Sequence, residues 1–276
     1  QSPMEITMVI NAVSKLRVSD EEIYRRLVIQ IHSRMAQEAL PVRDVSVIVS
    51  ALSRVQCSDA RLVGRFTDYA MHNLDDATPQ EISRLMDACM RVSLQANDFF
   101  NACVKKVQIQ AATLEPKGLS AAAFAFGQCF EAAEVSHLPY LRRIFQHIRS
   151  ATVATLPLFL PRELVSLLRT YSRWQISFPQ EQLRRVAERF VATHAQYDVE
   201  TGISAAYALS VLWERSTRRS VTQDSADLCE QAMNEAAELL LRPVWEAAEG
   251  PMPDVALLLR AVEASSILRP RDRAPI

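Results

Sequence analysis

A pattern of apolar, small and polar residues recurs along this chain every 37 to 39 residues. Its clearest copy spans 45–55, and two successive shifts of 37 residues carry it onto 82–92 and 119–129, while a shift of 39 residues back carries it onto 6–16. The apolar and small positions lie at i, i+3, i+6, i+7 and i+10, which is one face of an α-helix. A fixed period of this length predicts an array of helical repeats.

Each copy is followed by a short polar turn and a second amphipathic stretch. Weaker copies of the first stretch follow at 164–174, 203–212 and 255–265. The second stretches are predicted to be helical over 21–38, 60–73, 98–111, 139–153 and 179–194. One hairpin cannot bury both of its apolar faces, so the hairpins are expected to stack. We therefore predict an all-α fold, an α-solenoid of about six to seven antiparallel helical hairpins with repeats of 37–45 residues, similar to HEAT, armadillo or octotricopeptide arrays.

Helix starts are marked by N-terminal capping sequences. In Thr78-Pro79-Gln80-Glu81, the threonine supplies an N-cap acceptor, the proline suits the first helical position, and the glutamate can reach back to a free amide. The same elements, in whole or in part, recur as Ser2 to Glu5, Pro161 with Glu163, Pro179 with Glu181, and Ser19 with Glu22. A small residue is expected where two helices approach most closely. Such residues are Ala12, Ala51, Ala88, Ala125 and Ala208, with Thr170 as the one larger substitute.

Breaks in the repeat pattern suggest how the chain is organised. The solenoid is predicted over 1–241, with a polar loop at 216–226. Arg242-Pro243 is predicted to break a helix, because proline lacks the amide that a helix interior needs. Residues 242–268 are interpreted as C-terminal capping helices of the same solenoid, and 269–276 as a flexible tail.

The sequence offers no recognisable catalytic, metal or cofactor motif. It has 5 Gly and no Gly-rich phosphate loop, and its 5 His lie in different repeats without metal-ligand spacing. We expect a protein that is not an enzyme, with no cofactor, no bound metal, no small-molecule substrate and no membrane span. The 5 Cys are an odd number and widely spread, which predicts buried free thiols in a reducing compartment.

Basic residues on successive second helices carry the sharpest functional hypothesis. The candidates for RNA contact are Arg26, Arg65, Lys105, Lys106, Arg142, Arg143, Arg184 and Arg185. Several share a repeat register, so stacking would align them along one face, where they could follow a phosphate backbone. The other interpretation is that they are solvated and paired with neighbouring carboxylates. The net charge of −1 provides no general attraction for nucleic acid.

Aromatic residues allow two interpretations as well. Trp174, Trp213 and Trp245 suit either packing between repeats or base stacking, and packing is favoured because each ends an amphipathic stripe. Tyr24, Phe99 and Phe100 are expected in the core.

The repeat unit resembles that of organellar RNA-metabolism proteins. It reads Val45-Ser46-x-Ile48-x-x-Ala51-Leu52-x-Arg54-Val55, followed by a turn ending at Asp59 and by Leu62-Val63 in the second helix. It is similar to octotricopeptide, heptatricopeptide and FAST-kinase-like repeats, and to helical-repeat subunits of trypanosomatid mitochondrial complexes that handle guide RNA and messenger RNA or assemble mitoribosomes.

This resemblance implies a function and a compartment. It implies a non-catalytic subunit of a ribonucleoprotein complex for RNA editing, RNA stability or mitoribosome assembly in the mitochondrial matrix, with other protein subunits and single-stranded RNA as partners. The chain begins at Gln1, which is compatible with the removal of a transit peptide. Two alternatives remain at this stage, a pure protein–protein scaffold without RNA contact and a degenerate enzyme.

Overall fold

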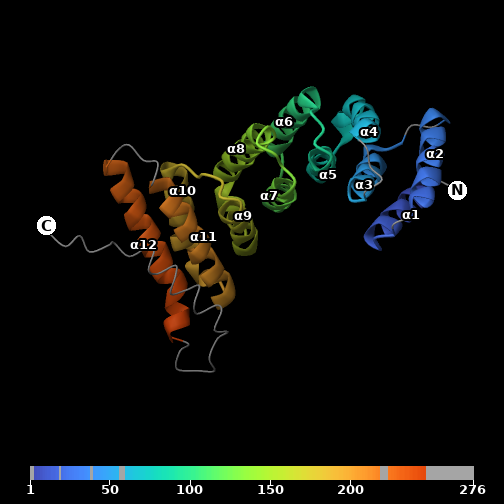
Figure 1. The fold of residues 1–276 in the computed structure, drawn as a ribbon. Helices are drawn as coiled ribbons and strands as arrows, with labels where there is room; N and C mark the ends of the chain where they lie inside the picture. Colours follow the sequence, from blue (N-terminus) through green and yellow to red (C-terminus); the bar gives the residue numbers. More distant parts are fainter. Residues whose placement is uncertain (1–2, 19, 38–39, 56–59, 218–222, 247–276) are drawn as a thin grey trace. The chain divides into compact units, whose positions relative to one another are not determined.

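The chain is an all-α protein of the helical-repeat, α-solenoid class, as the repeat pattern predicts (Figure 1). The computed structural model describes residues 3–18, 20–37, 40–55, 60–217 and 223–246. Within these ranges every regular element is a helix and no residue lies in a β-strand.

The described helices form six consecutive pairs. The first helices of the pairs are α1 (Pro3–Lys15), α3 (Val42–Ser53), α5 (Pro79–Arg91), α7 (Pro116–Gln128), α9 (Pro161–Arg173) and α11 (Val199–Thr217). The second helices are α2 (Glu21–Gln37), α4 (Ala60–His72), α6 (Asn97–Ala111), α8 (Leu138–Ala154), α10 (Gln180–Thr193) and α12 (Gln223–Glu246). The predicted second helices from 21 to 194 agree with α2, α4, α6, α8 and α10 to within one residue at each end.

Four short 3-10 helices join these elements. They are η1 (Leu74–Asp76), η2 (Cys129–Glu131), η3 (Leu156–Leu158) and η4 (His194–Gln196). Three of them, η1, η3 and η4, follow a second helix and lead into the next pair, whereas η2 follows the first helix α7. Sequence periodicity did not predict these single turns, because three residues are too few to show a period.

The chain divides into two compact units. One unit comprises 1–113 and 125–148, and the other comprises 114–124 and 149–276. In the first unit α1 packs against α3, and α3 against α5. In the second unit α9 packs against α11, while α12 packs against both α10 and α11. First helices therefore pack on first helices within each unit, which is the contact that defines a stacked helical array.

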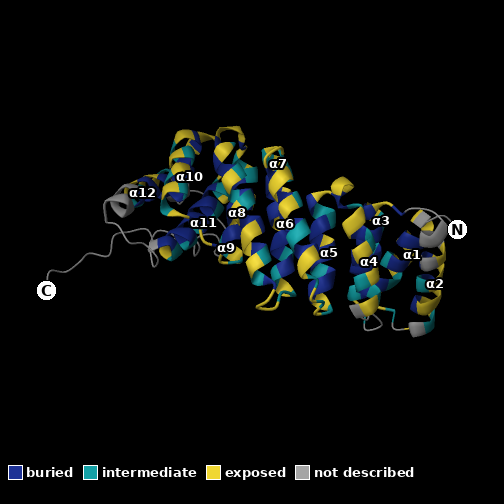
Figure 2. Cartoon of the chain, turned by 90° about the horizontal axis from the view of Figure 1, so that it is seen from above, coloured by how far each residue is buried: buried dark blue, intermediate teal, exposed yellow. Residues whose placement is uncertain are grey.

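The apolar and small positions of the repeat form the core of the array (Figure 2). Ile48 and Ala51 in α3 are fully buried, as are the equivalent Leu85 and Ala88 in α5. The small-residue prediction is thus confirmed at Ala51 and Ala88, and Ala208 and Thr170 are also buried. Ala125 is half-buried. At Ala12 the prediction is wrong: this residue is exposed, because the neighbours α2 and α3 cover other faces of α1.

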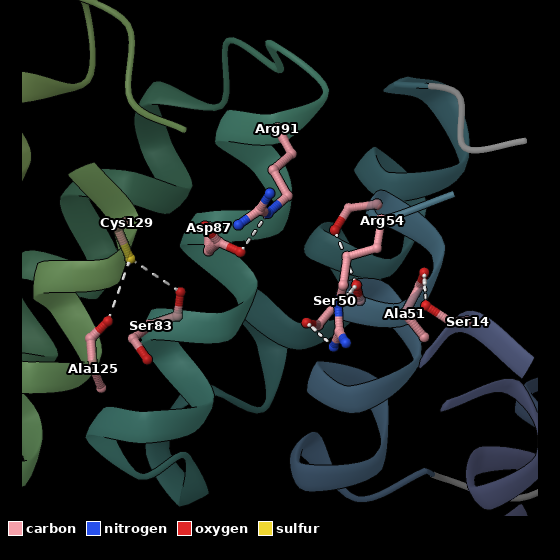
Figure 3. Close-up of polar contacts among 10 residues, drawn as sticks. Ser14, Ser50, Ala51, Arg54, Ser83, Asp87, Arg91, Ala125 and Cys129 are labelled. Atoms are coloured by element: carbon pink, nitrogen blue, oxygen red, sulfur yellow. Dashed lines mark hydrogen bonds and ion pairs between the residues drawn. The ribbon is translucent and has the colours of Figure 1, made fainter. Parts of the chain in front are cut away.

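Hydrogen bonds on the first helices tie the array together in the first unit (Figure 3). Ser14 of α1 donates to the carbonyl oxygen of Ala51 in α3 at 3.0 Å, a buried contact between successive repeats. Arg54, the C-cap residue of α3, donates to the hydroxyl of Ser50 at 2.8 Å and to the carbonyl oxygen of Ser50 at 3.0 Å. These hydrogen bonds offset the cost of removing the polar groups from water.

The capping prediction is confirmed at α5 and at α9. Glu81 accepts from the amide of Thr78 at 2.8 Å, and Thr78 accepts from the amide of Glu81 at 3.3 Å. At α9, Glu163 accepts from the amide of Leu160 at 3.1 Å, although a leucine side chain cannot return the bond. Ser2, the predicted cap of α1, lies outside the described residues.

The capping prediction is wrong at two other helices. At α2, Asp20 accepts from the amide of Glu22 at 2.9 Å and so supplies the cap, while the predicted Ser19 lies outside the described residues. A carboxylate is the stronger acceptor at a helix N-terminus, since it also interacts favourably with the helix dipole. At α10, Pro179 is the N-cap residue and not the first helical residue, and Glu181 pairs with Arg184 instead of the backbone.

Three first helices end in the same left-handed turn. Arg17, Ser93 and Gln175 have φ angles of 53°, 52° and 56°, and all three occupy the same slot of the repeat. The next residue is Val18, Leu94 or Ile176, and its amide donates a hydrogen bond to the carbonyl oxygen five residues earlier in the chain. This is the Schellman arrangement with an apolar residue after the turn. The sequence concealed it, because glycine, its usual signature, is missing from all three sites.

The structure corrects the C-terminal part of the prediction. The predicted loop at 216–226 is too long, since α11 continues to Thr217 and α12 already begins at Gln223. Residues 223–226 of the predicted loop belong to the first turn of α12. The helix α12 also continues through Pro243 to Glu246, because its packing against α10 and α11 offsets the lost backbone bond. The predicted helix at 255–268 and the tail at 269–276 lie outside the described residues.

Candidate functional site

All eight basic candidates lie on second helices, as the sequence predicts. Arg26 is on α2 and Arg65 is on α4. The remaining candidates are paired neighbours: Lys105 and Lys106 on α6, Arg142 and Arg143 on α8, and Arg184 and Arg185 on α10. Those from α2 to α8 belong to the first unit, and those on α10 belong to the second unit. What distinguishes the eight side chains is how each of them is bonded.

Two candidates form ion pairs within their own helices. Arg26 contacts Glu22 at 2.8 Å, and its hydrogen bond is the main reason that the pKa of the Glu22 carboxyl lies below its usual range. Arg184 contacts Glu181 at 2.7 Å and also pairs with Glu188. The hydrogen bond from Arg184 likewise lowers the pKa of Glu181. These pairs span three or four residues, so they partly neutralise the two arginines on the helix surface.

Two further candidates hold the turns between repeats. Lys106 donates to the carbonyl oxygen of Asp75 in η1 at 2.6 Å. Arg185 donates to the carbonyl oxygen of Val153, at the end of α8, at 3.4 Å. Carbonyls at helix ends lack intrahelical partners, so a cation on the next second helix stabilises them. The repeat register points to the same role, because Tyr69 occupies the slot of Lys106 one repeat earlier and its hydroxyl bonds the backbone of Leu40.

Arg143 takes part in a contact between α6 and α8 in the first unit. It donates to the side-chain oxygen of Asn101 at 3.1 Å, and one turn away Tyr140 donates to Asn97 at 3.0 Å. The guanidinium therefore links two helices, although it remains exposed to solvent.

Arg65, Lys105 and Arg142 remain, and we call them the basic trio. All three are exposed, and they lie on α4, α6 and α8 of the first unit. None of them has a hydrogen bond or ion pair with another described residue. Lys105 and Arg142 share a repeat slot, whereas the α4 residue in that slot is Asp68, and Arg65 stands one turn earlier. The trio can therefore offer its charges to a ligand without first breaking an internal bond.

The cysteine thiols that the structure describes lie in the core of the protein. Cys89, Cys103, Cys129 and Cys229 are free and buried, as expected, whereas Cys57 lies outside the described residues. Burial raises the pKa of Cys89 to about 12 and that of Cys103 and Cys129 well above their usual value. Cys129 also donates to the carbonyl oxygen of Ser83 at 3.3 Å (Figure 3). These thiols are protonated at neutral pH, and a protonated thiol is a poor nucleophile and a poor metal ligand.

We expect the folded protein to resist thiol-modifying reagents. In a Cys57→Ser chain, a disulfide reagent at pH 8 should modify the four remaining cysteines slowly in buffer and completely in denaturant, because the reactive thiolate is scarce in the fold. The absorbance of the released thiol measures both rates. Rapid modification of even one cysteine in buffer would contradict the burial that raises these pKa values.

The aromatic residues that were expected in the core are found there. Tyr24, Phe99 and Phe100 are buried, and so is Trp213. Trp174 is half-buried beside Arg173, whose guanidinium carbon lies 5.0 Å from the indole ring centre. The packing interpretation is thus confirmed for Trp213, while the side chain of Trp245 lies outside the described residues.

Across the described parts of the chain, no three His, Cys, Asp or Glu side chains gather as a metal site requires. Among these same residues, no helix is both long enough and apolar enough to span a bilayer. Comparison of the sequence with models of known protein families and with curated proteins found no match.

Proposed function

We propose that this protein is a non-catalytic helical-repeat subunit of a mitochondrial RNA-processing or ribonucleoprotein complex, in which it holds other proteins and contacts single-stranded RNA. The basic trio is the observation that carries the RNA contact, because three exposed cations on successive second helices are unbonded among the described residues. The matrix location and the assignment to RNA editing, RNA stability or mitoribosome assembly rest on the resemblance of the repeat unit to organellar RNA-metabolism proteins.

The physical basis of the contact is the release of counterions from RNA. Each phosphate of a single strand that a lysine or arginine neutralises adds about 0.7 to the magnitude of the slope of log affinity against log salt concentration. Three such contacts would account for a slope of roughly two, which is a modest and strongly salt-dependent affinity. This suits a subunit that contributes one contact among several in a larger assembly.

A pure protein scaffold is the second candidate function. It is favoured by the other five candidate cations, each of which bonds within the protein, such as Lys106 to the Asp75 carbonyl. It is favoured also by the net charge of −1, which gives no long-range attraction for RNA. On this alternative the basic trio is simply solvated.

The test is to reverse the charge of the basic trio. The combined variant Arg65→Glu, Lys105→Glu and Arg142→Glu should weaken binding of a fluorescent single-stranded RNA at least tenfold at low salt, because three phosphate contacts are lost. The magnitude of its salt slope should fall by about two. Fluorescence anisotropy at several salt concentrations measures both quantities, and circular dichroism verifies that helix content is unchanged.

A matched control changes the same total charge on first helices. The exposed residues Arg43 on α3, Arg84 on α5 and Lys117 on α7 comprise, like the basic trio, two arginines and one lysine. Their reversal to glutamate should leave affinity within about threefold of the unaltered protein, since it adds only general repulsion. Equal losses in both variants would show that net charge alone matters. An absence of RNA binding by the unaltered protein would favour the scaffold.

A further inference from the structure

One first helix of the second unit, α9, exposes only positive charge. Its exposed charged residues are Arg162, Arg169 and Arg173, which we call the arginine stripe. They stand at i, i+7 and i+11 and therefore lie along one side of the helix. At a rise of about 1.5 Å per residue, they are about 10.5 Å and about 6 Å apart along its axis. The acidic residue of α9, Glu163, is half-buried and caps the helix by accepting from the amide of Leu160.

The arginine stripe is accessible to a ligand. The side chain of Arg169 has no hydrogen bond or ion pair with any residue that the structure describes. Arg162 contacts Asp198 at 3.5 Å, but 85% of its side chain is exposed, and an exposed pair of this kind is weak. The guanidinium carbon of Arg173 lies 5.0 Å from the ring centre of Trp174, which restricts its motion while the side chain stays exposed. A guanidinium that is already ordered loses less entropy when a carboxylate binds.

Aromatic side chains lie on both sides of Arg169 in the repeat register. The helix α7 packs against α9 through a hydrogen bond from Ser120 to the carbonyl oxygen of Glu163 at 2.8 Å, and α9 packs against α11. The slot of Arg169 is occupied in α7 by Phe124, which is 56% exposed, and in α11 by Tyr207, which is half-buried. We call these two residues the aromatic pair. The exposed face of α9 therefore has apolar surface on each side of its middle arginine.

The positive charge follows α9 and does not continue across the array. On α11 the slot of Arg162 holds the exposed Glu200, and the slot of Arg169 holds a member of the aromatic pair. A single strand of RNA that ran from repeat to repeat would meet a negative charge there, whereas a segment lying along α9 meets all three arginines. A helix presents carboxylates at matching intervals, because its residues i, i+7 and i+11 also share one side. Ser166, an exposed small residue between Arg162 and Arg169, leaves room for such a helix to approach.

We propose that the arginine stripe docks an acidic helix of a partner protein, which lies along α9 with apolar flanks on the aromatic pair. A guanidinium group binds a carboxylate through two parallel hydrogen bonds, so this contact depends on the spacing of the carboxylates as well as on their charge. The inference rests on the protein-holding part of the proposed function. It does not depend on the RNA contact, which is assigned to α4, α6 and α8 of the first unit.

Binding of a designed peptide tests the proposal. The probe is a fluorescein-labelled helix of alanine and glutamine with glutamates at i, i+4, i+7 and i+11, a spacing that fits the arginine stripe in either chain direction, and with leucines beside the middle glutamates. Fluorescence anisotropy at low salt should show at least about tenfold weaker binding when Arg162, Arg169 and Arg173 are all changed to glutamate. Arg169→Gln alone should weaken binding at least about threefold, which keeps the test open if the triple variant fails to fold. Circular dichroism verifies folding.

The charge-reversed basic trio is the matched control, since it also changes three cations to glutamate. It should bind the peptide within about threefold of the unaltered protein, because it adds only general repulsion. A peptide of the same composition with its glutamates distributed around the helix should bind at least about fivefold more weakly, because few of its carboxylates reach the stripe at once. A peptide with lysine in place of glutamate should bind the charge-reversed α9 variant and not the unaltered protein.

Labelled single-stranded RNA separates this inference from the proposed RNA contact. The charge-reversed α9 variant should bind this RNA within about threefold of the unaltered protein. Failure of the unaltered protein to bind RNA would count against the RNA contact alone, because the peptide is measured in a separate titration. Three results would overturn the inference: no binding of the matched peptide, equal binding of the matched and redistributed peptides, or equal loss of peptide binding in the α9 and basic-trio variants. Loss of RNA binding instead of peptide binding in the α9 variant would also overturn it, because the arginine stripe would then be a nucleic-acid contact.

Discussion

Replacement of Phe100 by alanine is expected to lower the free energy of unfolding by about 3–5 kcal/mol. Phe100 is fully buried at the contact between α6 and α8 in the first unit. Its ring stacks on Tyr140 with centroids 5.2 Å apart and contacts the buried His137 at the same distance. Truncation removes this aromatic contact and leaves a cavity that neighbouring helices cannot fill completely. Urea denaturation followed by circular dichroism measures the loss.

Phe124→Ala is the control for this effect. Phe124 is the same residue type on another helix, α7, but 56% of it is exposed. Its truncation should change the free energy of unfolding by less than about 0.5 kcal/mol, because surface positions contribute little packing energy. Similar losses for the two variants would show that α6 and α8 do not pack around Phe100 as described.

Replacement of Gly202 by alanine is expected to destabilise the protein by about 1–3 kcal/mol. A β-carbon at Gly202 in α11 would lie 2.9 Å from the carbonyl oxygen of Leu240 in α12, inside the second unit. The obstacle is backbone, so one of the two helices must move. This cost opposes the gain of up to about 1 kcal/mol that alanine normally brings to a helix interior. Thermal and urea denaturation of the purified variant provide the measurement.

Gly64→Ala separates the close approach from the effect of helix propensity. Gly64 is also a helical glycine, in α4, but its β-carbon would meet only the side chain of Leu94, at 3.9 Å and 4.0 Å. We expect this variant to be more stable than the unaltered protein by about 0.5–1 kcal/mol. If Gly202→Ala were equally stabilising, α11 and α12 would have to lie farther apart than the structure places them.

The paired helices could be predicted because local chemistry determines them. The apolar slots recur at helical spacing, and Thr78 to Glu81 carry a complete capping motif, so their limits follow from neighbouring residues. The prediction of helix ends failed where the sequence carried no local signal or where tertiary packing outweighed that signal. Gln175 takes a left-handed conformation without being glycine, and α12 continues through Pro243 because tertiary packing offsets a local cost.

The candidate site shows the same division. The sequence identified the basic residues of the second helices and the buried cysteines, because both follow from position on an amphipathic helix. It could not distinguish Lys105 from its neighbour Lys106, although only Lys106 donates to the carbonyl oxygen of Asp75. Nor could it show that Ala12 of α1 is exposed while Ala51, at the same repeat position in α3, is buried. Helices and their apolar faces are determined by contacts a few residues apart, whereas burial and bonding depend on which distant helix packs against each face.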